Sequence, residues 1–372
     1  MVPDFRKLAR NEIIDLPVYS PGLDADAVRE RYGLEEVIKL ASNENPLGPS
    51  PLVVDAIRRE ALEVSRYPDG ACTRLRKELS RRLEISEQAL VFGNGADEII
   101  DMIFFAFVGK DDGVVMGEPT FSSYFLSGMT MGARIEYVVL DEHRHHPGQM
   151  LARVTPGTKA VFVGTPHNPT GTICTSGDLE LMLEELSPDV LLVWDEAYRE
   201  YVDDPDYPES IPLVADHPNL VVLRTFSKAY GLAGLRVGYG VAHPGIVEML
   251  EKVRPPFNVN RLAMAAALAA LNDTGHLAET ISVNRAGKEY LSAEFARLGM
   301  ETVPTQANFI LVRFDGVVDD LAGRLLEKGV IVRDGAALGY PGHVRLTIGT
   351  AVQNRAVIRA AEEILECGPD RR

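Results

Sequence analysis

DVLLVWDEAY, residues 189–198, indicates the fold class more clearly than any other stretch of the chain. Its apolar residues follow one another without alternating with polar ones, which is typical of a strand buried on both faces of a sheet. Similar Val-rich runs recur every few tens of residues, as GVVMG (113–117), RIEYVVL (134–140), KAVFVGTP (159–166) and NLVVLRTFSK (219–228). Helical patterns separate these runs, so we predict an α/β fold with a mostly parallel sheet.

The pattern changes at about residue 260. Two long helical patterns, 261–273 and 276–299, lead into short apolar runs such as NFILVRF and HVRLTIGT, and a last helical pattern covers 351–366. A chain of 372 residues is long enough for two domains. We expect a large α/β domain over residues 43–259 and a smaller α+β domain over 260–372. Residues 1–42 are expected to form an N-terminal arm and part of the small domain.

The composition narrows the classes of partner and compartment. With 38 Lys and Arg against 54 Asp and Glu, the net charge of -16 disfavours nucleic acid as a partner. The 3 cysteines are too few and too scattered for a disulfide framework or a zinc site. The first residues have no apolar signal-peptide core, and the chain has no apolar run of about 18 residues. We therefore expect a cytoplasmic protein that neither binds nor crosses a membrane.

Polar residues stand where several of the predicted strands end. Ligands of open parallel sheets bind beyond the carboxyl ends of the strands. The residues found there are Gly95 after ALVF, Asn168 after AVFVGTP, Asp195 after VLLVW, and Ser227 with Lys228 after VVLRTF. They predict a ligand site at this edge of the sheet.

Lys228 and Asp195 suggest the chemistry of that site. An amine that reacts covalently must first lose its proton, which burial or a nearby charge favours. Lys228 follows an apolar strand and precedes the small, apolar AYGLAGLRVGYG, although an ordinary surface lysine is the alternative. Asp195 ends a strand too apolar to leave a carboxylate without a partner. The protonated ring nitrogen of pyridoxal phosphate is one candidate partner, and a helix cap or turn is the alternative role for Asp195.

Other residues would complete a pyridoxal phosphate site. Tyr198 and Asn168 could bond the phenolic oxygen of the cofactor, although NPTG is also a good turn sequence. Ser227, Arg236 and the helix N-terminus in GNGADE could hold its phosphate. GNGADE has no third glycine at the spacing of the dinucleotide fingerprint, so a dinucleotide site is disfavoured. The three histidines of HRHHPG (143–148) are expected in a solvated loop, and no metal site is predicted.

The ordered motifs NPTG, DEAY and SKAYGLAGLRVGY resemble the fold type I, pyridoxal-phosphate-dependent enzymes of the aspartate aminotransferase type. Further motifs are similar to those of the histidinol-phosphate aminotransferase family: LPVYSPG, LASNENPLGPS, RYPDG, GNGADE, QANFILV, GVIVRDG and HVRLTIGT. The resemblance spans nearly the whole chain.

The resemblance implies a role for each matching residue. Lys228 is the expected Schiff-base lysine, and Asp195 and Tyr198 are expected to assist it in catalysis. The implied cofactor contacts are Tyr67 from a neighbouring subunit, Gly95, Ala96, Asp97, Phe121, Asn168, Asp195, Tyr198, Ser227, Lys228 and Arg236. The implied substrate contacts are Tyr19, Asn45, Asn168, Phe257, Arg333 and Arg345. Phe121 and Phe257 stand where many members carry tyrosine, which makes the site less polar.

The resemblance also implies an activity. We expect a transaminase that moves an amino group between an amino donor and a 2-oxo acid, with histidinol phosphate and 2-oxoglutarate as the substrates, in histidine biosynthesis. It is expected to be a homodimer with shared active sites. An aromatic amino acid aminotransferase acting on phenylalanine or tyrosine is the alternative. A decarboxylase of a phosphorylated amino acid and a non-catalytic binder are more distant ones.

Overall fold

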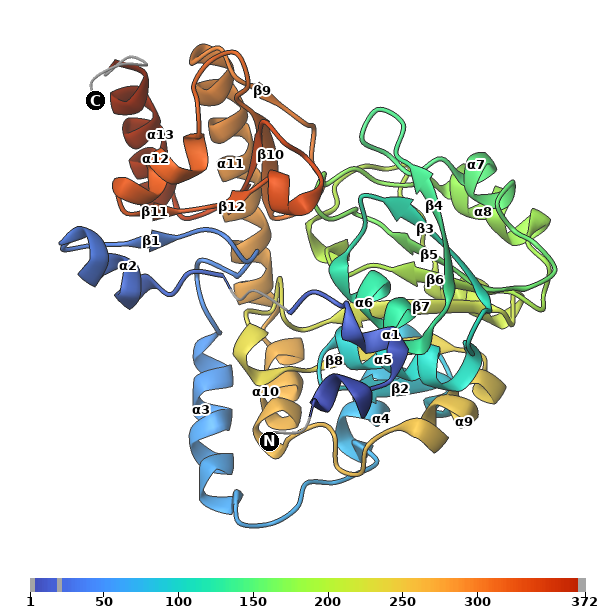
Figure 1. The fold of residues 1–372 in the computed structure, drawn as a ribbon. Helices are drawn as coiled ribbons and strands as arrows, with labels where there is room; N and C mark the ends of the chain where they lie inside the picture. The colour runs from blue at the N-terminus through green and yellow to red at the C-terminus, as the bar shows by residue number, and fades with distance from the viewer. Residues whose placement is uncertain (1–3, 19–21, 367–372) are drawn as a thin grey trace.

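A computed structural model describes residues 4–18 and 22–366 of the chain (Figure 1). The α-helices are α1 (Asn11–Ile14), α2 (Ala25–Tyr32), α3 (Pro51–Glu60), α4 (Thr73–Leu83), α5 (Ala96–Phe107), α6 (Ser122–Met131), α7 (Pro147–Leu151), α8 (Ser176–Glu185), α9 (Pro244–Val253), α10 (Arg261–Asn272), α11 (Thr274–Arg297), α12 (Leu321–Glu327) and α13 (Ala351–Glu366). The strands are β1 (Ile38–Lys39), β2 (Leu90–Gly93), β3 (Gly113–Glu118), β4 (Arg134–Val139), β5 (Thr158–Gly164), β6 (Leu191–Asp195), β7 (Leu220–Thr225), β8 (Gly238–Ala242), β9 (Glu301–Thr302), β10 (Phe309–Arg313), β11 (Val330–Ile331), β12 (Arg333–Asp334) and β13 (His343–Thr347). Short 3-10 helices are η1 (Phe5–Lys7), η2 (Ala61–Glu63), η3 (Glu87–Ala89), η4 (Arg199–Tyr201), η5 (Ile211–Ala215), η6 (Ala233–Leu235) and η7 (Ala336–Leu338).

The large sheet has 7 strands in the order β2-β8-β7-β6-β5-β3-β4. Strand β8 is antiparallel to both of its neighbours, and the remaining pairs are parallel. The five apolar runs of the sequence form β3 to β7. The predicted α/β fold with a mostly parallel sheet is therefore confirmed.

Both faces of the large sheet are buried, which explains why its strands do not alternate. In β6, Leu192 and Trp194 belong to one apolar cluster, with side chains from α4, α8 and α10. The intervening Leu191 and Val193 belong to a second cluster, with side chains from α5 and α9. Each apolar residue of the run thus has a core to enter, whichever face it points to.

A second region is built on a 4-stranded antiparallel sheet in the order β12-β13-β10-β9. Side chains of α11, α12 and α13 form its core. Figure 1 shows this region in orange and red at the upper left of the large sheet. Strand β1 pairs with β11, so the chain before residue 40 joins this region as well. A smaller α+β part is therefore confirmed.

The domain limits at 42 and 259 remain our proposal. The pairing of β1 with β11 supports the assignment of part of residues 1–42 to the small domain. Helix α10 lies just beyond the second limit, yet its Ala263, Ala266 and Ala267 pack into the core of the large sheet.

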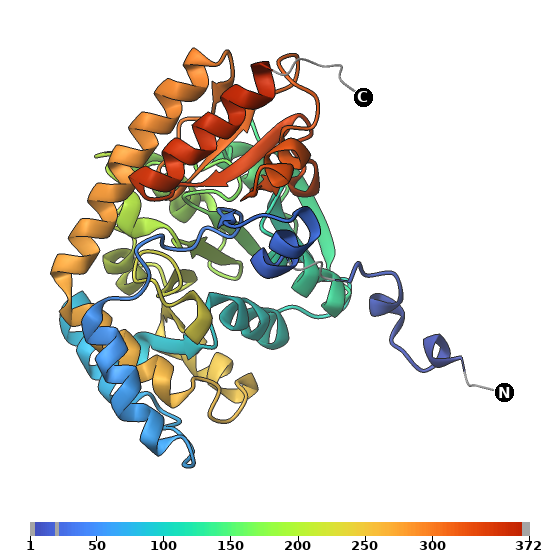
Figure 2. The same cartoon turned by 90° about the vertical axis from the view of Figure 1, so that its left-hand side faces the viewer.

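The segment with η1 extends away from the body of the molecule, whereas α1 lies against α6 (Figure 2). Its apolar side chains Phe5 and Leu8 are exposed. Among the described helices, none is long and apolar enough to cross a membrane.

Candidate active site

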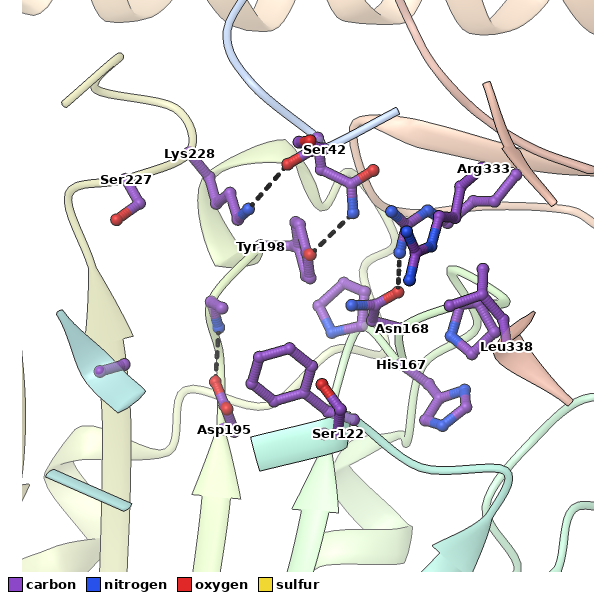
Figure 3. A pocket seen from close by; sticks show the side chains of 18 of the residues that line it. Ser42, Ser122, His167, Asn168, Asp195, Tyr198, Ser227, Lys228, Arg333 and Leu338 are labelled. Carbon is purple, nitrogen blue, oxygen red and sulfur yellow. Dashed lines mark hydrogen bonds between the residues drawn. The ribbon is translucent and has the colours of Figure 1, made fainter. Parts of the chain in front are cut away.

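A cavity of about 380 Å³ opens between the carboxyl ends of β5, β6 and β7, the start of α5, and the small region (Figure 3). Most of the residues predicted for the site line it. They are Ala96, Asp97, Phe121, Asn168, Asp195, Tyr198, Ser227, Lys228, Arg236, Arg333 and Arg345. Side chains more than 200 residues apart in the sequence thus surround one cavity.

Asp195 is the last residue of β6 and is buried. Its Oδ2 accepts a hydrogen bond of 2.6 Å from the Tyr124 hydroxyl, and its Oδ1 accepts one of 3.0 Å from the backbone N–H of Ala197. Burial raises the pKa of Asp195 to about 6, although its two hydrogen bonds act to lower this pKa. A carboxylate in these surroundings is well placed to pair with a protonated ring nitrogen.

Lys228 lies three residues beyond the end of β7, and its side chain points into the cavity (Figure 3). Its Nζ donates to the carbonyl of Ser42 at 3.3 Å and lies 5.6 Å from the centre of the Tyr198 ring. Within the described chain it has no ion pair with a carboxylate. Both partners, a carbonyl and a ring, are uncharged. The amine can therefore leave them to react.

Ser227, Arg236 and the start of α5 form one corner of the cavity, the Arg236 corner. Helix α5 begins after Gly95, whose φ of 84° is left-handed, and has no side-chain cap. A Cβ on Gly95 would lie 2.5 Å from Arg236 Nη2, so glycine lets the guanidinium approach this turn. Arg236 donates to Ser227 Oγ at 3.3 Å and to Asp97 Oδ2 at 2.9 Å. A helix N-terminus beside a guanidinium and a hydroxyl suits a phosphate.

The Phe121 ring and two polar side chains, Tyr198 and Asn168, also line the cavity. Phe121 precedes α6, and its ring meets the ring of Tyr124 edge to face at 5.5 Å. The Oη of Tyr198 accepts a hydrogen bond of 3.0 Å from Asn43 Nδ2. Asn168 Oδ1 accepts one from Arg345 at 2.5 Å. A flat ring could stack on Phe121 with its edge toward Tyr198 and Asn168.

Arg333 and Arg345 bring two guanidiniums to the side of the small region. They are paired residues of the neighbouring strands β12 and β13. Arg345 is buried and donates to the carbonyl of Ala41 at 2.8 Å, while its Nε has no partner. Burial lowers the pKa of Arg345 to about 10, and the charge of Arg333 adds to this effect. A doubly charged anion would relieve the repulsion between the two side chains.

Four predicted residues of the described chain do not line the cavity: Gly95, Asn45, Tyr67 and Phe257. Gly95 packs closely against the Arg236 guanidinium, and Tyr19 is outside the described residues. Asn45 is buried and donates to the carbonyl of Ala229 and to Thr280 Oγ1. Phe257 is half-exposed and stacks on Tyr67, which is 79% exposed, with ring centres 4.8 Å apart. Tyr67 likewise stays outside the cavity of its own chain, so we propose that it and Phe257 act on a neighbouring subunit.

Several residues that line the cavity were not predicted from the sequence. Tyr124 lies three residues after Phe121 on α6, a helical spacing that could have indicated it. Ser42 and Asn43 belong to the motif LASNENPLGPS, but nothing in the motif distinguishes Asn43 from Asn45. His167 lines the cavity beside Asn168.

The prediction of a solvated loop for HRHHPG is wrong for His145. His145 is buried, and its ring meets the ring of His167 edge to face at 4.7 Å. Burial lowers the pKa of His145 to about 4. Over the described ranges, no group of three or more His, Cys, Asp or Glu side chains could hold a metal ion.

Known proteins share this architecture. The family model "Aminotransferase class I and II" matches residues 35–364. A histidinol-phosphate aminotransferase of Moorella thermoacetica is 46% identical over 96% of this chain and 92% of its own, and one of Bacillus subtilis is 44% identical over 96% and 99%. A crystal structure of histidinol-phosphate aminotransferase from Sinorhizobium meliloti in complex with pyridoxal-5'-phosphate superposes with a TM-score of 0.88 at 27% identity, covering 96% of this chain and 97% of the other. The chain belongs to the class I and II aminotransferase family, and within it to the histidinol-phosphate aminotransferases.

Proposed function

We propose that this protein is a pyridoxal-phosphate-dependent aminotransferase that exchanges an amino group between histidinol phosphate and 2-oxoglutarate, in histidine biosynthesis. One observation carries the proposal: Lys228, Asp195, the Arg236 corner, and the Arg333 and Arg345 pair all surround one cavity. The relatives named above support the substrate, since they are histidinol-phosphate aminotransferases.

The residues around the cavity match the chemical groups of pyridoxal phosphate. Asp195 would hold the ring nitrogen, and the Arg236 corner, with Ser227 and the amides of Ala96 and Asp97, would hold the phosphate. Phe121 would cover one face of the ring, while Tyr198 and Asn168 would bond its phenolic oxygen. Lys228 Nζ would carry the cofactor covalently.

When bound, the cofactor supplies an electron sink for the bond that breaks at the substrate α-carbon. Asp195 keeps a proton on the ring nitrogen, because a buried carboxylate stabilises a cation beside it. Lys228 Nζ, once free, would take the proton from the substrate α-carbon and hold it for return, acting as the general base and then as the general acid. The Tyr198 hydroxyl would donate a hydrogen bond to the phenolic oxygen.

Arg333 and Arg345 support the choice of histidinol phosphate. This substrate has a phosphate where an amino acid has its α-carboxylate, and two guanidiniums neutralise a dianion better than one does. Arg345 is held toward the cavity by its hydrogen bonds to the Ala41 carbonyl and to Asn168. No side-chain hydrogen bond or ion pair holds Arg333 in the described chain, so it is free to meet the ligand.

Arg333→Ala is therefore expected to lower kcat/KM much more for histidinol phosphate than for phenylalanine or tyrosine. A charge-assisted hydrogen bond contributes about 1.5 to 3 kcal/mol, or about 10- to 150-fold. The test is a half-reaction assay in which the cofactor absorbance is followed as each amino donor is added in turn, for the wild type and the variant. Arg313→Ala, which removes a guanidinium paired with exposed carboxylates, is the matched control.

The alternatives predict other results in the same assay. Equal losses for both classes of donor, or a wild type that prefers phenylalanine or tyrosine, would favour an aromatic amino acid aminotransferase. Release of CO₂ from a phosphorylated amino acid would indicate the decarboxylase.

We further propose a cytoplasmic homodimer whose two sites share residues. The exposed Tyr67 and Phe257 stack, with Leu62 and Val64 also exposed nearby in sequence, supports a partner subunit over this face. The extended segment with Phe5 and Leu8 supports it as well, because exposed apolar side chains are costly without a partner.

Mixing Tyr67→Phe protein with Lys228→Ala protein tests the shared site. If Tyr67 serves the neighbouring subunit, each hybrid dimer has one site with both residues intact, so random exchange restores about a quarter of the wild-type activity. The assay is the half-reaction at limiting cofactor after subunit exchange. Mixing Lys228→Ala with a variant that carries both substitutions is the control and restores nothing. The same absence of recovery in the main experiment would place Tyr67 in the site of its own subunit.

A further inference from the structure

Three consecutive residues, Ala41, Ser42 and Asn43, each contact a different functional side chain. The carbonyl of Ala41 accepts from Arg345, and the carbonyl of Ser42 accepts from Lys228. The side-chain amide of Asn43 donates to Tyr198 (Figure 3). The first two contacts use backbone atoms, which any residue supplies. Only the contact of Asn43 depends on the identity of the side chain.

Asn43 is held on the small region while it reaches across to the large sheet. Its backbone N–H donates to Thr347 Oγ1 of β13 at 2.9 Å, and its carbonyl accepts from Asn308 Nδ2 at 3.0 Å. Its φ of 57° is left-handed, a conformation that asparagine adopts more readily than most residues. The residue is only 1% exposed. This anchoring fixes the place from which its amide meets Tyr198.

The amide of Asn43 has a defined direction. Its Oδ1 accepts from the Thr347 hydroxyl at 3.4 Å, which leaves Nδ2 to face Tyr198 Oη at 3.0 Å. An amide NH₂ can only donate, so the Tyr198 oxygen must accept there. The Tyr198 proton then has to point elsewhere. Within the described chain no acceptor lies within hydrogen-bonding distance of it, and the ring of Phe309 meets the Tyr198 ring edge to face. The cavity is the direction that remains.

We propose that Asn43 is a positioning residue that turns the Tyr198 hydroxyl proton into the cavity, toward the place of the phenolic oxygen of the cofactor. This inference rests on the proposed function, since it assumes that pyridoxal phosphate binds there. Asn43 does not touch the reacting atoms in this arrangement. Its amide donates a hydrogen bond to the Tyr198 oxygen and cannot accept one from it. The Tyr198 hydroxyl can therefore donate only to the ligand.

Asn43→Asp reverses this direction. The new carboxylate keeps the shape and the tolerance of a left-handed φ, but it accepts a hydrogen bond where the amide donated one. The Tyr198 proton then turns away from the cavity. A phenolic oxygen that loses this donor holds a proton more tightly, so the pH midpoint of the absorbance change of the bound cofactor rises. A hydrogen bond to a charged group is worth about tenfold or more, so the expected rise is about one pH unit.

The experiment compares four proteins reconstituted with pyridoxal phosphate: wild type, Asn43→Asp, Tyr198→Phe and the double variant. Each is titrated with pH while the visible absorbance is followed, and the Kd of the cofactor is measured on the apoprotein. Both single variants are expected to raise the midpoint, and Asn43→Asp is expected to add nothing once Tyr198 has lost its hydroxyl. Asn43→Gly, which fits the same φ without an amide, is the control for the backbone and is expected to raise the midpoint less than Asn43→Asp does.

The possible failures are distinguishable. An unchanged midpoint in Asn43→Asp would mean that the amide does not direct the Tyr198 proton. Additive shifts in the double variant would mean that the new charge acts on the cofactor directly, without Tyr198. Either result overturns the role of Asn43 while the response of Tyr198→Phe still supports the proposed function. A wild type that binds no pyridoxal phosphate would overturn both.

Discussion

Lys228→Ala is expected to lower the rate of amino transfer by about four orders of magnitude or more, because the same amine is proposed both to carry the cofactor and to move the proton. No other amine lines the described cavity to replace it. The measurement is a single-turnover half-reaction with histidinol phosphate.

The variant is expected to stay folded, which separates this loss from unfolding. Lys228 Nζ has one hydrogen bond, to the Ser42 carbonyl, and one ring contact, with Tyr198. Its removal leaves no buried charge without a partner, so Tm is expected to change little. Borohydride reduction and peptide mapping of the wild type are expected to find the cofactor label on Lys228.

The matched control is Lys252→Ala on α9, whose side chain pairs with Glu248 on the surface. It is expected to keep both the label on Lys228 and the activity. A label on another lysine, or less than a tenfold loss of rate in Lys228→Ala, would contradict the assignment.

Features that depend on a few neighbouring residues, such as strands, helix starts and strand ends, could be predicted from the sequence. The apolar run that forms β6 has no alternation because both of its faces are buried, and that absence of pattern is visible in the letters. Serine followed by proline is typical of a helix start, and the Oγ of Ser50 accepts from Val53 N–H at the start of α3. Asp195 and Lys228 could be brought together because the ends of neighbouring parallel strands, β6 and β7, lie side by side.

Features that depend on backbone direction and on distant packing could not be predicted. Asn43 and Asn45 stand two residues apart in one motif, yet a left-handed φ at Asn43 helps to orient it toward Tyr198. Asn45 instead bonds the backbone beside Lys228. No sequence pattern states which of the two amides faces the cavity.

The burial of His145 could not be predicted either, because it depends on residues distant in the sequence. Its neighbours in HRHHPG are polar, which predicts a solvated loop. Gly117 lies beneath it on β3, and a Cβ there would come within 2.6 Å of the His145 ring. The space that buries this histidine is therefore provided by a glycine 28 residues earlier in the numbering, together with the ring of His167.

Asp195→Asn is expected to bind pyridoxal phosphate and yet lose several orders of magnitude in kcat for amino transfer. Asparagine fills the same space and its Oδ1 can still accept from Tyr124 or from the Ala197 N–H, but it carries no charge to hold a proton on the ring nitrogen. The measurement is kcat in the half-reaction, with the bound cofactor quantified by absorbance. A fall of less than tenfold, about 1.4 kcal/mol, would mean that the charge of Asp195 does not act on the ring nitrogen.

The apoprotein gives an independent test of the same carboxylate, because its burial is costly when no cation lies beside it. The pKa of Asp195 is raised from 3.8 to about 6 in the folded chain, so the folded state binds its proton more tightly than the unfolded state does. The contribution of Asp195 to stability is therefore fully present below pH 3.8 and is lost as the pH rises through about 6. The loss amounts to about 3 kcal/mol at most, since each pKa unit is worth about 1.4 kcal/mol. Asparagine has no proton to lose, so apo Asp195→Asn is expected to melt at a higher temperature than the apo wild type at pH 7, with no such difference at pH 3.5. Bound pyridoxal phosphate is expected to reverse this order of melting temperatures at pH 7. Its protonated ring nitrogen would give the wild-type carboxylate the cation that it needs, whereas asparagine has no charge to hold that proton.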